Sequence, residues 1–494
     1  MKFTSTRGRA SLSASETIVR GIAADGGLFV PETFPAIPAE LASHLPGMNY
    51  RGRAAAILPL WLDDFPAAEL RAAVENAYSG TFDRDDPAPL VETAPGVFFL
   101  ELWHGQTCAF KDMALQLLPH LLTSAVRRVA PGRTMVILTA TSGDTGKAAL
   151  AGFADVPGVK IIVFYPRDGV SAMQKLQMAT QAGDNVAVCG IEGNFDDAQS
   201  GVKAIFGDPE MRQFLAARQL DFSSANSINF GRLAPQVVYY VSAWCDLVKR
   251  GRLQPGETFN VCVPTGNFGN ILAAWYAKQS GVPIGRFICA SNRNNVLTDF
   301  IRTGTYDRNR EFFTTTSPSM DILISSNLER LLLNFFDRDG KAVAGLMAEL
   351  KTGGRYQIPA SVGAKLQNDF WADCCDDAET QAEIGRLFRE RGYLADTHTA
   401  VASRVYGKYA AATGDRRPCV IASTASPFKF APAVLPAVWD GAVPADEFAA
   451  TAKLAEVTGR PVPAPLAALA GLPVRHRTSV AKSEMADFIR RFLA

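Results

Sequence analysis

Short runs of apolar and β-branched residues alternate with helix-periodic segments over most of the chain. The clearest unit predicts a strand over 134–139, a glycine-containing turn, a helix over 147–153 and a second strand over 160–165. This alternation is typical of βαβ units and of a mainly parallel sheet. The same pattern predicts strands over 97–102, 185–189, 258–263 and 419–422, and helices over 113–129 (interrupted by Pro119), after Asn194, over 271–278 and over 483–493.

Turn-forming and proline-rich stretches divide this pattern into four parts. Mixed helical patterning up to about residue 80 predicts an N-terminal accessory domain over 1–95. Three prolines among acidic residues over 81–96 favour a connection between lobes. We expect a first α/β lobe over 96–245, a second α/β lobe over 246–440 and a C-terminal helical tail over 441–494.

Composition places the chain among globular proteins. Hydrophobic residues make up 48% and charged residues 20% of its 494 residues, which excludes wholesale disorder and fibrous repeats. At roughly 150 residues per domain, this length predicts two to four domains or lobes. Lysine plus arginine number 50 and aspartate plus glutamate 49, for a net charge of +1. This balance gives no global attraction to nucleic acid or to an anionic membrane, so an anionic ligand has to be bound locally.

Cysteine spacing and apolar runs bear on location and metal binding. Of eight cysteines only Cys374 and Cys375 are close neighbours, which fits neither a disulfide framework nor a zinc site. We therefore expect a reducing compartment, a cytoplasmic location and no metal. No run reaches the ~18 apolar residues of a membrane helix, and a secretory apolar block is missing. The first twenty residues, with four basic residues, several serines and one acid, also fit an organelle-targeting segment.

Ligands in open α/β sheets bind at the carboxyl ends of strands, so unusual strand-to-helix turns are candidate sites. The first is Gly266-Asn267-Phe268-Gly269-Asn270, whose glycines let the backbone curl while the next helix presents free N–H groups. These features suit a phosphate cradle, and a tight turn with a helix cap fits about equally well. The spacing matches neither a dinucleotide fingerprint nor a P-loop, which disfavours nucleotide binding.

A second turn, Thr141-Ser142-Gly143-Asp144-Thr145, offers hydroxyls and backbone amides at a helix start and can bind a carboxylate. Asp144 alone would repel such a group. The alternative is an ordinary helix cap, because aspartate, serine and threonine are the commonest N-cap residues.

Lys111 defines the third turn, Ala109-Phe110-Lys111-Asp112, where its charge opposes the dipole of the helix it begins. A lowered pKa would make this amine a nucleophile able to form a Schiff base, although nearly all lysines are solvated at the surface. The fourth turn, Ser423-Thr424-Ala425-Ser426, follows an apolar strand. A hydroxyl there can hydrogen-bond to a ring nitrogen or cap the next turn.

Taken together, these turns resemble those of the threonine synthase family, pyridoxal-phosphate enzymes of the tryptophan-synthase-β fold group. The likeness runs in order from about Thr6 to Phe430, and because the basic N-terminus falls inside it we expect no cleaved leader. The segments that carry it are Thr6-Arg7-Gly8, Asp25-Gly26-Gly27-Leu28-Phe29-Val30-Pro31, Glu101-Leu102-Trp103-His104-Gly105-Gln106-Thr107-Cys108-Ala109-Phe110-Lys111-Asp112, Thr141 to Gly146, Val263-Pro264-Thr265-Gly266-Asn267-Phe268-Gly269-Asn270, Ser319-Met320-Asp321-Ile322 and Ser325-Ser326-Asn327-Leu328-Glu329-Arg330.

The resemblance implies an α/β, two-lobed PLP fold of type II, with parallel sheets flanked by helices and an N-terminal accessory domain. It implies that Lys111 is the catalytic residue and carries pyridoxal 5'-phosphate covalently, with Asp144 near the ring hydroxyl and Thr424 facing the pyridine nitrogen. The other residues that it implies are Gly266, Asn267, Phe268, Gly269 and Asn270 for the cofactor phosphate, Thr141, Ser142 and Thr145 for the substrate carboxylate, and Asn226, Ser227 and Arg232 for the substrate phosphate.

The implied reaction converts O-phospho-L-homoserine and water to L-threonine and phosphate. An alternative is a related phospholyase that releases 2-oxobutanoate and phosphate. A third possibility is a protein that keeps the fold only for binding or assembly, which the retention of Lys111 argues against. We expect a small-molecule substrate and, because the N-terminal region is long and no regulatory module is evident, a monomer.

Two positions depart from the family pattern that the chain resembles. Ser426 stands where histidine is usual, and Thr397 stands where proline is common. Neither change affects the lysine or the phosphate loop, so the resemblance implies that cofactor binding survives while reaction specificity is open. His398 and His104 are candidates for a role near the substrate, or hydrogen-bonded core histidines, an interpretation that we favour for His104 at a strand end.

Overall fold

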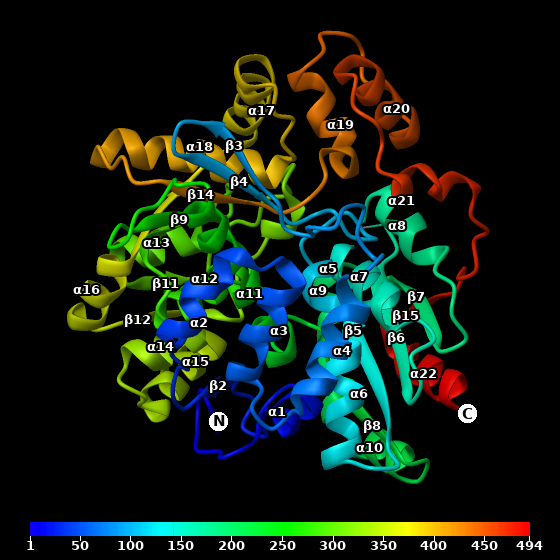
Figure 1. Ribbon diagram of the computed structural model, residues 1–494. Helices are drawn as coiled ribbons and strands as arrows, with labels where there is room; N and C mark the ends of the chain where they lie inside the picture. Colours follow the sequence, from blue (N-terminus) through cyan, green and yellow to red (C-terminus); the bar gives the residue numbers. More distant parts are fainter. Residues whose placement is uncertain (142, 169) are drawn as a thin grey trace.

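The computed structural model describes residues 1–141, 143–168 and 170–494. Two mainly parallel sheets, each covered by helices on both faces, form two lobes, and the N-terminal helices pack across their junction (Figure 1). This is the α/β architecture that the alternating pattern predicts. No described helix is both long and apolar enough to cross a membrane.

The larger sheet has six strands. Its order is β13 (Phe370–Cys374), β10 (Ile284–Ser291), β9 (Phe259–Pro264), β14 (Cys419–Ser423), β4 (Val97–Glu101) and β3 (Leu90–Ala94). All neighbours are parallel except β3, which forms an antiparallel hairpin with β4. Every residue of β9 and β14 is buried, because α18 (Thr397–Thr413) covers one face and α12 (Gly269–Gln279) packs on the sheet as well. Continuous apolar strands are the expected consequence of burial on both faces.

The smaller sheet has five parallel strands. Its order is β15 (Ser479–Ala481), β7 (Val186–Glu192), β6 (Val159–Pro166), β5 (Thr134–Ala140) and β8 (Leu220–Ser223). Alternate residues of β5 face two different cores. Val136 and Leu138 pack with α9 (Phe195–Gly207) and α22 (Met485–Leu493), whereas Ile137 packs with α7 (Asp144–Phe153).

A long helix, α11 (Phe230–Lys249), joins the lobes to the N-terminal domain. It is apolar almost all round and accordingly buried, with α12, α3 (Tyr50–Trp61) and α1 (Ala14–Arg20) packed against it. The indole of Trp61 stacks on Tyr276 of α12 with ring centroids 5.6 Å apart. The N-terminal region therefore shares the main core. It also contains β1 (Phe3–Ser5), β2 (Phe29–Pro31), α2 (Ala39–His44) and α4 (Ala67–Tyr78).

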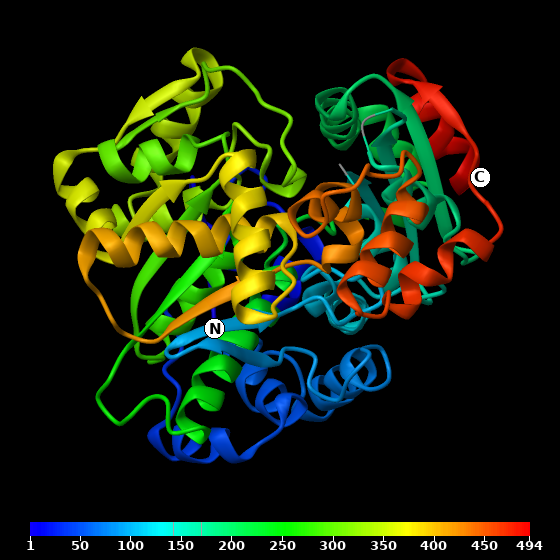
Figure 2. The same cartoon turned by 90° about the horizontal axis from the view of Figure 1, so that it is seen from above.

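After β14 the chain crosses from the larger sheet to the smaller one, where α20 (Glu447–Thr458) packs on α8 (Ala172–Ala179) (Figure 2). The remaining elements are α5 (Asp112–Leu115), α6 (Leu118–Val129), α10 (Pro209–Ala216), α13 (Val296–Thr303), β11 (Thr305–Asp307), α14 (Leu328–Phe335), α15 (Gly340–Gly353), β12 (Arg355–Gln357), α16 (Ala360–Asp369), α17 (Asp377–Arg391), α19 (Ala431–Val434) and α21 (Ala464–Ala467). Short 3₁₀ turns lie at Leu45–Gly47, Pro318–Met320, Pro427–Phe430, Leu435–Ala437, Leu469–Gly471 and Lys482–Glu484.

The structure differs from the expected division at three points. Strand β3 lies inside the segment 81–96 that the prolines marked as a connection, and β4, expected in the first lobe, belongs to the six-stranded sheet. Strand β15 lies in the tail over 441–494, which was expected to be helical, and completes the edge of the other sheet. Strand β15 pairs with β7 and strand β4 pairs with β14, each across a long stretch of the chain, and local periodicity does not encode such pairing.

The predicted helix over 113–129 is also two helices, α5 and α6. Pro119 lies in the first turn of α6 rather than inside a continuous helix. A proline is tolerated there because first-turn N–H groups have no intrahelical partner.

Candidate active site

A cavity of about 750 Å³ lies where the two lobes meet. Its walls come from the turns that follow β5, β9 and β14, which is where an open α/β fold places a ligand. Twelve of the residues predicted from the sequence line it. They are Lys111, Thr141, Thr145, Asn226, Ser227, Arg232, Gly266, Asn267, Phe268, Gly269, Asn270 and Thr424. Asp144 is not part of the cavity wall but contacts the Lys111 amine, and Ser142 lies outside the described residues.

Lys111 occupies the N-cap position of α5, with its side chain buried at the wall of the cavity. The backbone N–H of Phe110 donates to the carbonyl oxygen of Thr424 at 2.8 Å, which ties the lysine turn to the turn after β14. Burial lowers the pKa of the Lys111 amine, which Asp144 opposes and the cations Lys429 and Arg232 reinforce. Together these effects place the pKa of the Lys111 amine below its ordinary value, as a nucleophilic amine requires.

Asp144, the first residue of α7, is the charged partner of Lys111. Its Oδ2 lies 3.4 Å from the Lys111 Nζ, and its Oδ1 lies 2.7 Å from the Nζ of Lys429 and accepts from Gln174 Nε2 at 2.9 Å. Burial acts to raise the pKa of this carboxyl. The ammonium groups of Lys429 and Lys111 and these hydrogen bonds outweigh burial, so the pKa lies well below its usual range.

Lys429 is a residue that the sequence reasoning missed. Its side chain is fully buried, and its Nζ also donates to the carbonyl oxygen of Thr107 at 2.9 Å. A signal was present, because this lysine follows the fourth turn within Pro427-Phe428-Lys429-Phe430, where apolar neighbours predict burial.

The turn before α12 curls tightly. Phe268 adopts a left-handed backbone with φ of 62°, and a Cβ added to Gly266 would lie 2.8 Å from the carbonyl oxygen of Ser319. On the outer side, Ser325 Oγ donates to the Gly266 carbonyl at 2.7 Å and Asn327 Nδ2 to the Asn267 carbonyl at 2.9 Å. The residues at the start of α12 line the cavity, and because the first N–H groups of a helix have no intrahelical partner, this arrangement is suited to a phosphate. Ser325 and Asn327 belong to a segment that carries the family resemblance, but they are not among the predicted site residues.

A second basic region lies at the start of α11. Arg232 is 3% exposed, donates from Nη1 to the Ala225 carbonyl at 3.0 Å, and has no carboxylate within ion-pair distance among the residues described. Burial lowers the pKa of its guanidinium to about 10, so it stays charged at neutral pH. In the described part of the chain, Arg232 Nε, Asn226 Oδ1 and Asn270 Nδ2 are buried without hydrogen-bond partners. Unsatisfied buried polar atoms beside a cavity mark a place for a polar ligand.

The turn after β5 is braced from within. Thr141 Oγ1 accepts from the backbone N–H groups of Gly143 at 3.0 Å and Gly146 at 2.9 Å. These bonds match the ordinary capping interpretation of the turn and leave the Thr141 hydroxyl hydrogen free to point elsewhere. Thr145 contributes to the cavity wall.

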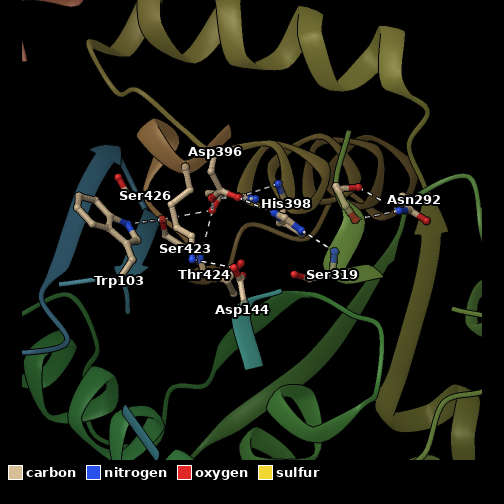
Figure 3. A network of polar contacts seen from close by, with 12 residues as sticks. Trp103, Asp144, Asn292, Ser319, Asp396, His398, Ser423, Thr424 and Ser426 are labelled. Atoms are coloured by element: carbon tan, nitrogen blue, oxygen red, sulfur yellow. Dashed lines mark hydrogen bonds and ion pairs between the residues drawn. The ribbon is translucent and has the colours of Figure 1, made fainter. Parts of the chain in front are cut away.

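Thr424 and Ser423 lie side by side at the end of β14 (Figure 3). Thr424 lines the cavity, whereas Ser423 is held away from it by Trp103 Nε1 at 3.1 Å and the Tyr393 hydroxyl at 3.0 Å. Ser426 accepts from the backbone N–H of Phe428 at 3.4 Å and caps a 3₁₀ turn. Ser426 is fully buried and does not line the cavity, so the departure from histidine here changes a cap rather than a cavity wall.

The two candidate histidines have different surroundings. His398 lines the cavity, with Nδ1 2.9 Å from Asp396 Oδ1 (Figure 3). His104 lies outside the cavity wall, with one ring nitrogen 2.8 Å from Asp83 and the other 2.9 Å from Glu101. His104 thus has the surroundings of a hydrogen-bonded core histidine.

Comparison with known families identifies the class of protein to which this chain belongs. Residues 2–78 match the family described as threonine synthase N terminus, and residues 86–349 match the family described as pyridoxal-phosphate dependent enzyme. The fold and site are those of a pyridoxal-phosphate-dependent enzyme. The chain belongs to the threonine synthase family, as the relatives below also show.

Several relatives support that assignment. Threonine synthase-like 1 of Homo sapiens is 44% identical over 434 residues, covering 86% of this chain, and the chain spans only 58% of that relative's length. Threonine synthase of Pseudomonas aeruginosa is 38% identical, covering 88% of this chain and 90% of that protein. Among solved structures, the PLP-bound threonine synthase from Brucella melitensis is 36% identical with a TM-score of 0.85, covering 100% of this chain and 99% of that one. The yeast threonine synthase is 32% identical with a TM-score of 0.88, covering 100% and 98%.

The residues present fit pyridoxal 5'-phosphate, the cofactor that these comparisons indicate. A buried lysine of lowered pKa suits the aldehyde, and the turn before α12, in which Gly266 has no room for a side chain, suits the phosphate. The unpartnered Nδ2 of Asn270 adds a donor at the same place.

Proposed function

We propose that this protein is a threonine synthase, which converts O-phospho-L-homoserine and water to L-threonine and phosphate. The observation that carries the proposal is one cavity with two separate anion sites beside a buried lysine. The first is the Gly266–Asn270 turn at the start of α12, and the second is Arg232 with Asn226 at the start of α11. A phosphorylated substrate reacting on a phosphorylated cofactor requires two such sites.

In this proposal, Lys111 carries the cofactor, the Gly266–Asn270 turn holds its phosphate, and Asp144 lies near its ring hydroxyl. When bound, pyridoxal phosphate acts as an electron sink for negative charge at the substrate α carbon. The Thr424 hydroxyl, which lines the cavity, would face the pyridine nitrogen. Because a hydroxyl does not hold that nitrogen protonated as a carboxylate would, more of the proton transfer falls to Lys111.

Substrate groups are assigned to the remaining residues. Arg232, with Asn226 and Ser227, binds the substrate phosphate, since a guanidinium pairs its planar fork with two phosphate oxygens. Thr141, Ser142 and Thr145 bind the carboxylate. The Lys111 amine, once freed by the substrate, would take the α proton and a β proton as phosphate leaves from the γ carbon, and would then return a proton to the γ carbon, which becomes the methyl group of threonine. Water would then add at the β carbon, a proton would return to the α carbon, and threonine would be released when Lys111 takes back its place.

A phospholyase that releases 2-oxobutanoate and phosphate is the second candidate. We retain this candidate because the chain is 44% identical to threonine synthase-like 1, whereas it is 38% and 35% identical to two relatives named threonine synthase. The two reactions share elimination of phosphate and differ in whether water is added at the β carbon.

Product analysis separates these candidates. The PLP-loaded protein is mixed with O-phosphohomoserine, and products are identified by mass spectrometry together with released phosphate. Threonine formed in step with phosphate supports the synthase, and 2-oxobutanoate with phosphate supports the lyase. Lys111→Ala is the control. We expect it to lose both the cofactor linkage and turnover, by about 10³-fold or more. A protein that kept the fold for binding alone would release no phosphate.

We further propose a monomeric, cytoplasmic enzyme acting on a small molecule. All eight cysteines are free thiols, which supports a reducing compartment. Light scattering on the eluted peak of a size-exclusion column measures the mass directly, and a mass near 53.2 kDa is the expected value for one chain.

A further inference from the structure

A buried ion pair connects the two lobes beside the cavity. Lys429 lies in the 3₁₀ turn Pro427–Phe430, which follows β14 of the six-stranded sheet, and Asp144 begins α7 against the five-stranded sheet. Their Nζ and Oδ1 atoms are 2.7 Å apart, with side chains 0% and 4% exposed. The same ammonium donates to the carbonyl of Thr107, in the turn that leads to Lys111. One side chain therefore joins three segments that shape the site.

The charges around Asp144 are unbalanced. Its carboxylate lies 2.7 Å from Lys429 and 3.4 Å from Lys111, so two ammonium groups face one carboxylate, and Lys111 has Arg232 as a further cationic neighbour. A buried carboxylate needs one close cation to offset its loss of hydration. Lys429 meets that need at the shorter distance, which leaves Lys111 as the surplus cation of the group.

We propose that Lys429 is a positioning residue of this site: it neutralises Asp144 across the junction of the lobes and thereby leaves the Lys111 amine free to lose its proton and capture the cofactor aldehyde. In that capture the Lys111 nitrogen bonds to the aldehyde carbon and the aldehyde oxygen leaves as water, with no change of oxidation state. This inference rests on the proposed role of Lys111.

The charges around Lys111 shift the pKa of its amine in the direction that this role requires. Burial lowers the pKa of the Lys111 amine, Asp144 raises it, and Lys429 and Arg232 lower it. Removal of Lys429 takes away one lowering influence and leaves Lys111 as the sole close ammonium partner of Asp144 in the described part of the chain. The amine should then hold its proton to higher pH.

The test measures cofactor capture rather than turnover. The full-length apoprotein is mixed with pyridoxal phosphate from pH 6 to pH 10, the linkage is fixed with borohydride, and the Lys111 peptide is quantified by mass spectrometry. In Lys429→Met we expect the pH midpoint of capture to rise by about one unit and the rate at pH 7 to fall about tenfold. Lys429→Arg keeps the charge and should restore both values.

Lys408→Met is the matched control. Lys408 also forms a lysine–carboxylate pair, with Glu379 at 2.8 Å, and donates to the Cys374 carbonyl at 2.7 Å, but it lies on α18 and does not line the cavity. Its capture midpoint should equal that of the unmodified protein. An unchanged midpoint in folded Lys429→Met, or no recovery in Lys429→Arg, overturns the inference.

A second variant covers the case in which Lys429→Met does not fold. Asp144→Asn removes the carboxylate that holds the Lys111 proton, so the midpoint should move in the opposite direction, to lower pH. No shift there would also overturn the inference. Failure of the proposed function itself looks different, because the borohydride adduct in the unmodified protein would then lie on a lysine other than Lys111 or be missing.

Discussion

The backbone N–H of Ser319 donates a hydrogen bond to Nε2 of His398 at 3.1 Å. An acceptor role fixes Nε2 as unprotonated, so the ring proton is on Nδ1, which donates to Asp396. The Asp396 carboxylate is fully buried and also accepts from the backbone of His398 itself. With Nε2 accepting from Ser319, we expect His398 to organise the cavity wall rather than to act as a general base.

Replacing His398 should therefore weaken cofactor binding rather than proton transfer. Ser319 packs its carbonyl against Gly266, so loss of its anchor in His398→Ala loosens the phosphate turn. We expect the dissociation constant for pyridoxal phosphate to rise about tenfold, as for one lost hydrogen bond to a buried group. Equilibrium dialysis measures it, and His398→Gln, which keeps an acceptor, is the control. Loss of the acid limb of the pH–rate profile with unchanged cofactor affinity would instead identify a proton carrier.

Gly266→Ala tests the crowding at the phosphate turn. The new methyl group would lie 2.8 Å from the Ser319 carbonyl oxygen, and because this neighbour is backbone it cannot swing aside. We expect the apoprotein to lose about 1–3 kcal/mol of unfolding free energy, as in other overpacked sites. Urea denaturation measures the loss. Gly269→Ala is the control in the same turn, since its nearest neighbour would be an ordinary 3.5 Å contact, and it should leave stability unchanged or higher. Equal losses in both variants would exclude the contact as the cause.

We expect Arg232 to destabilise the apoprotein and to strengthen substrate binding. In Arg232→Met the apoprotein loses a buried cation that has no carboxylate partner among the described residues and donates to one backbone acceptor, the Ala225 carbonyl, so we expect its unfolding free energy to rise by about 1 kcal/mol. The KM for O-phosphohomoserine should rise about 10- to 100-fold, since charge-assisted hydrogen bonds to the phosphate are lost. Denaturation curves and steady-state kinetics measure the two effects.

Arg330→Met provides the contrast. Arg330 is equally buried, but its guanidinium donates to the carbonyls of Phe29 at 2.9 Å and Ile228 at 2.6 Å. Its removal leaves those acceptors unsatisfied, and we expect a loss of about 1–3 kcal/mol. Destabilisation of similar size in both variants would mean that Arg232 serves the fold and not an anion.

The alternation of apolar runs and helical segments was sufficient to predict the parallel sheets. The strands predicted over 134–139 and 160–165 are β5 and β6, each within a residue or so at either end, because a strand buried on both faces is a continuous apolar run bounded by turns. Strand β15 could not be found in this way. It has three residues, and it exists because Ser479 pairs with Gly190 nearly 300 residues earlier in the chain.

The same distinction applies to the site. Lys111, the Gly266–Asn270 turn and Thr424 each follow a strand, so their convergence on one cavity could be predicted from sheet geometry. The apolar neighbours of Lys429 predict its burial, but its ion pair could not be predicted, because its partner Asp144 is 285 residues away and the pair depends on the chain crossing between lobes. Ser325 and Asn327 brace the phosphate turn through its outer carbonyls, which no local spacing reveals.

Asp112, next to Lys111, should give the apoprotein a distinct pH dependence. Burial raises the pKa of its carboxyl to about 6, against the hydrogen bonds that it accepts from Thr107. The native state therefore holds this proton between about pH 4 and pH 6, where the unfolded chain has lost it. By linkage, this contribution to stability is full below pH 4, falls as the pH rises to 6, and is constant above. Its size is at most about 3 kcal/mol.

Asp112→Asn removes the proton uptake, so its unfolding free energy should vary less between pH 4 and pH 6 than that of the unmodified apoprotein. Urea denaturation at pH 4, 5, 6 and 7 gives the comparison. Asp337→Asn, at a side chain 83% exposed, should leave the original slope in place. Curves for Asp112→Asn that run parallel to the unmodified protein across this range would mean that the buried carboxyl titrates at the same pH in both states, and that the Thr107 hydrogen bonds fully offset its burial.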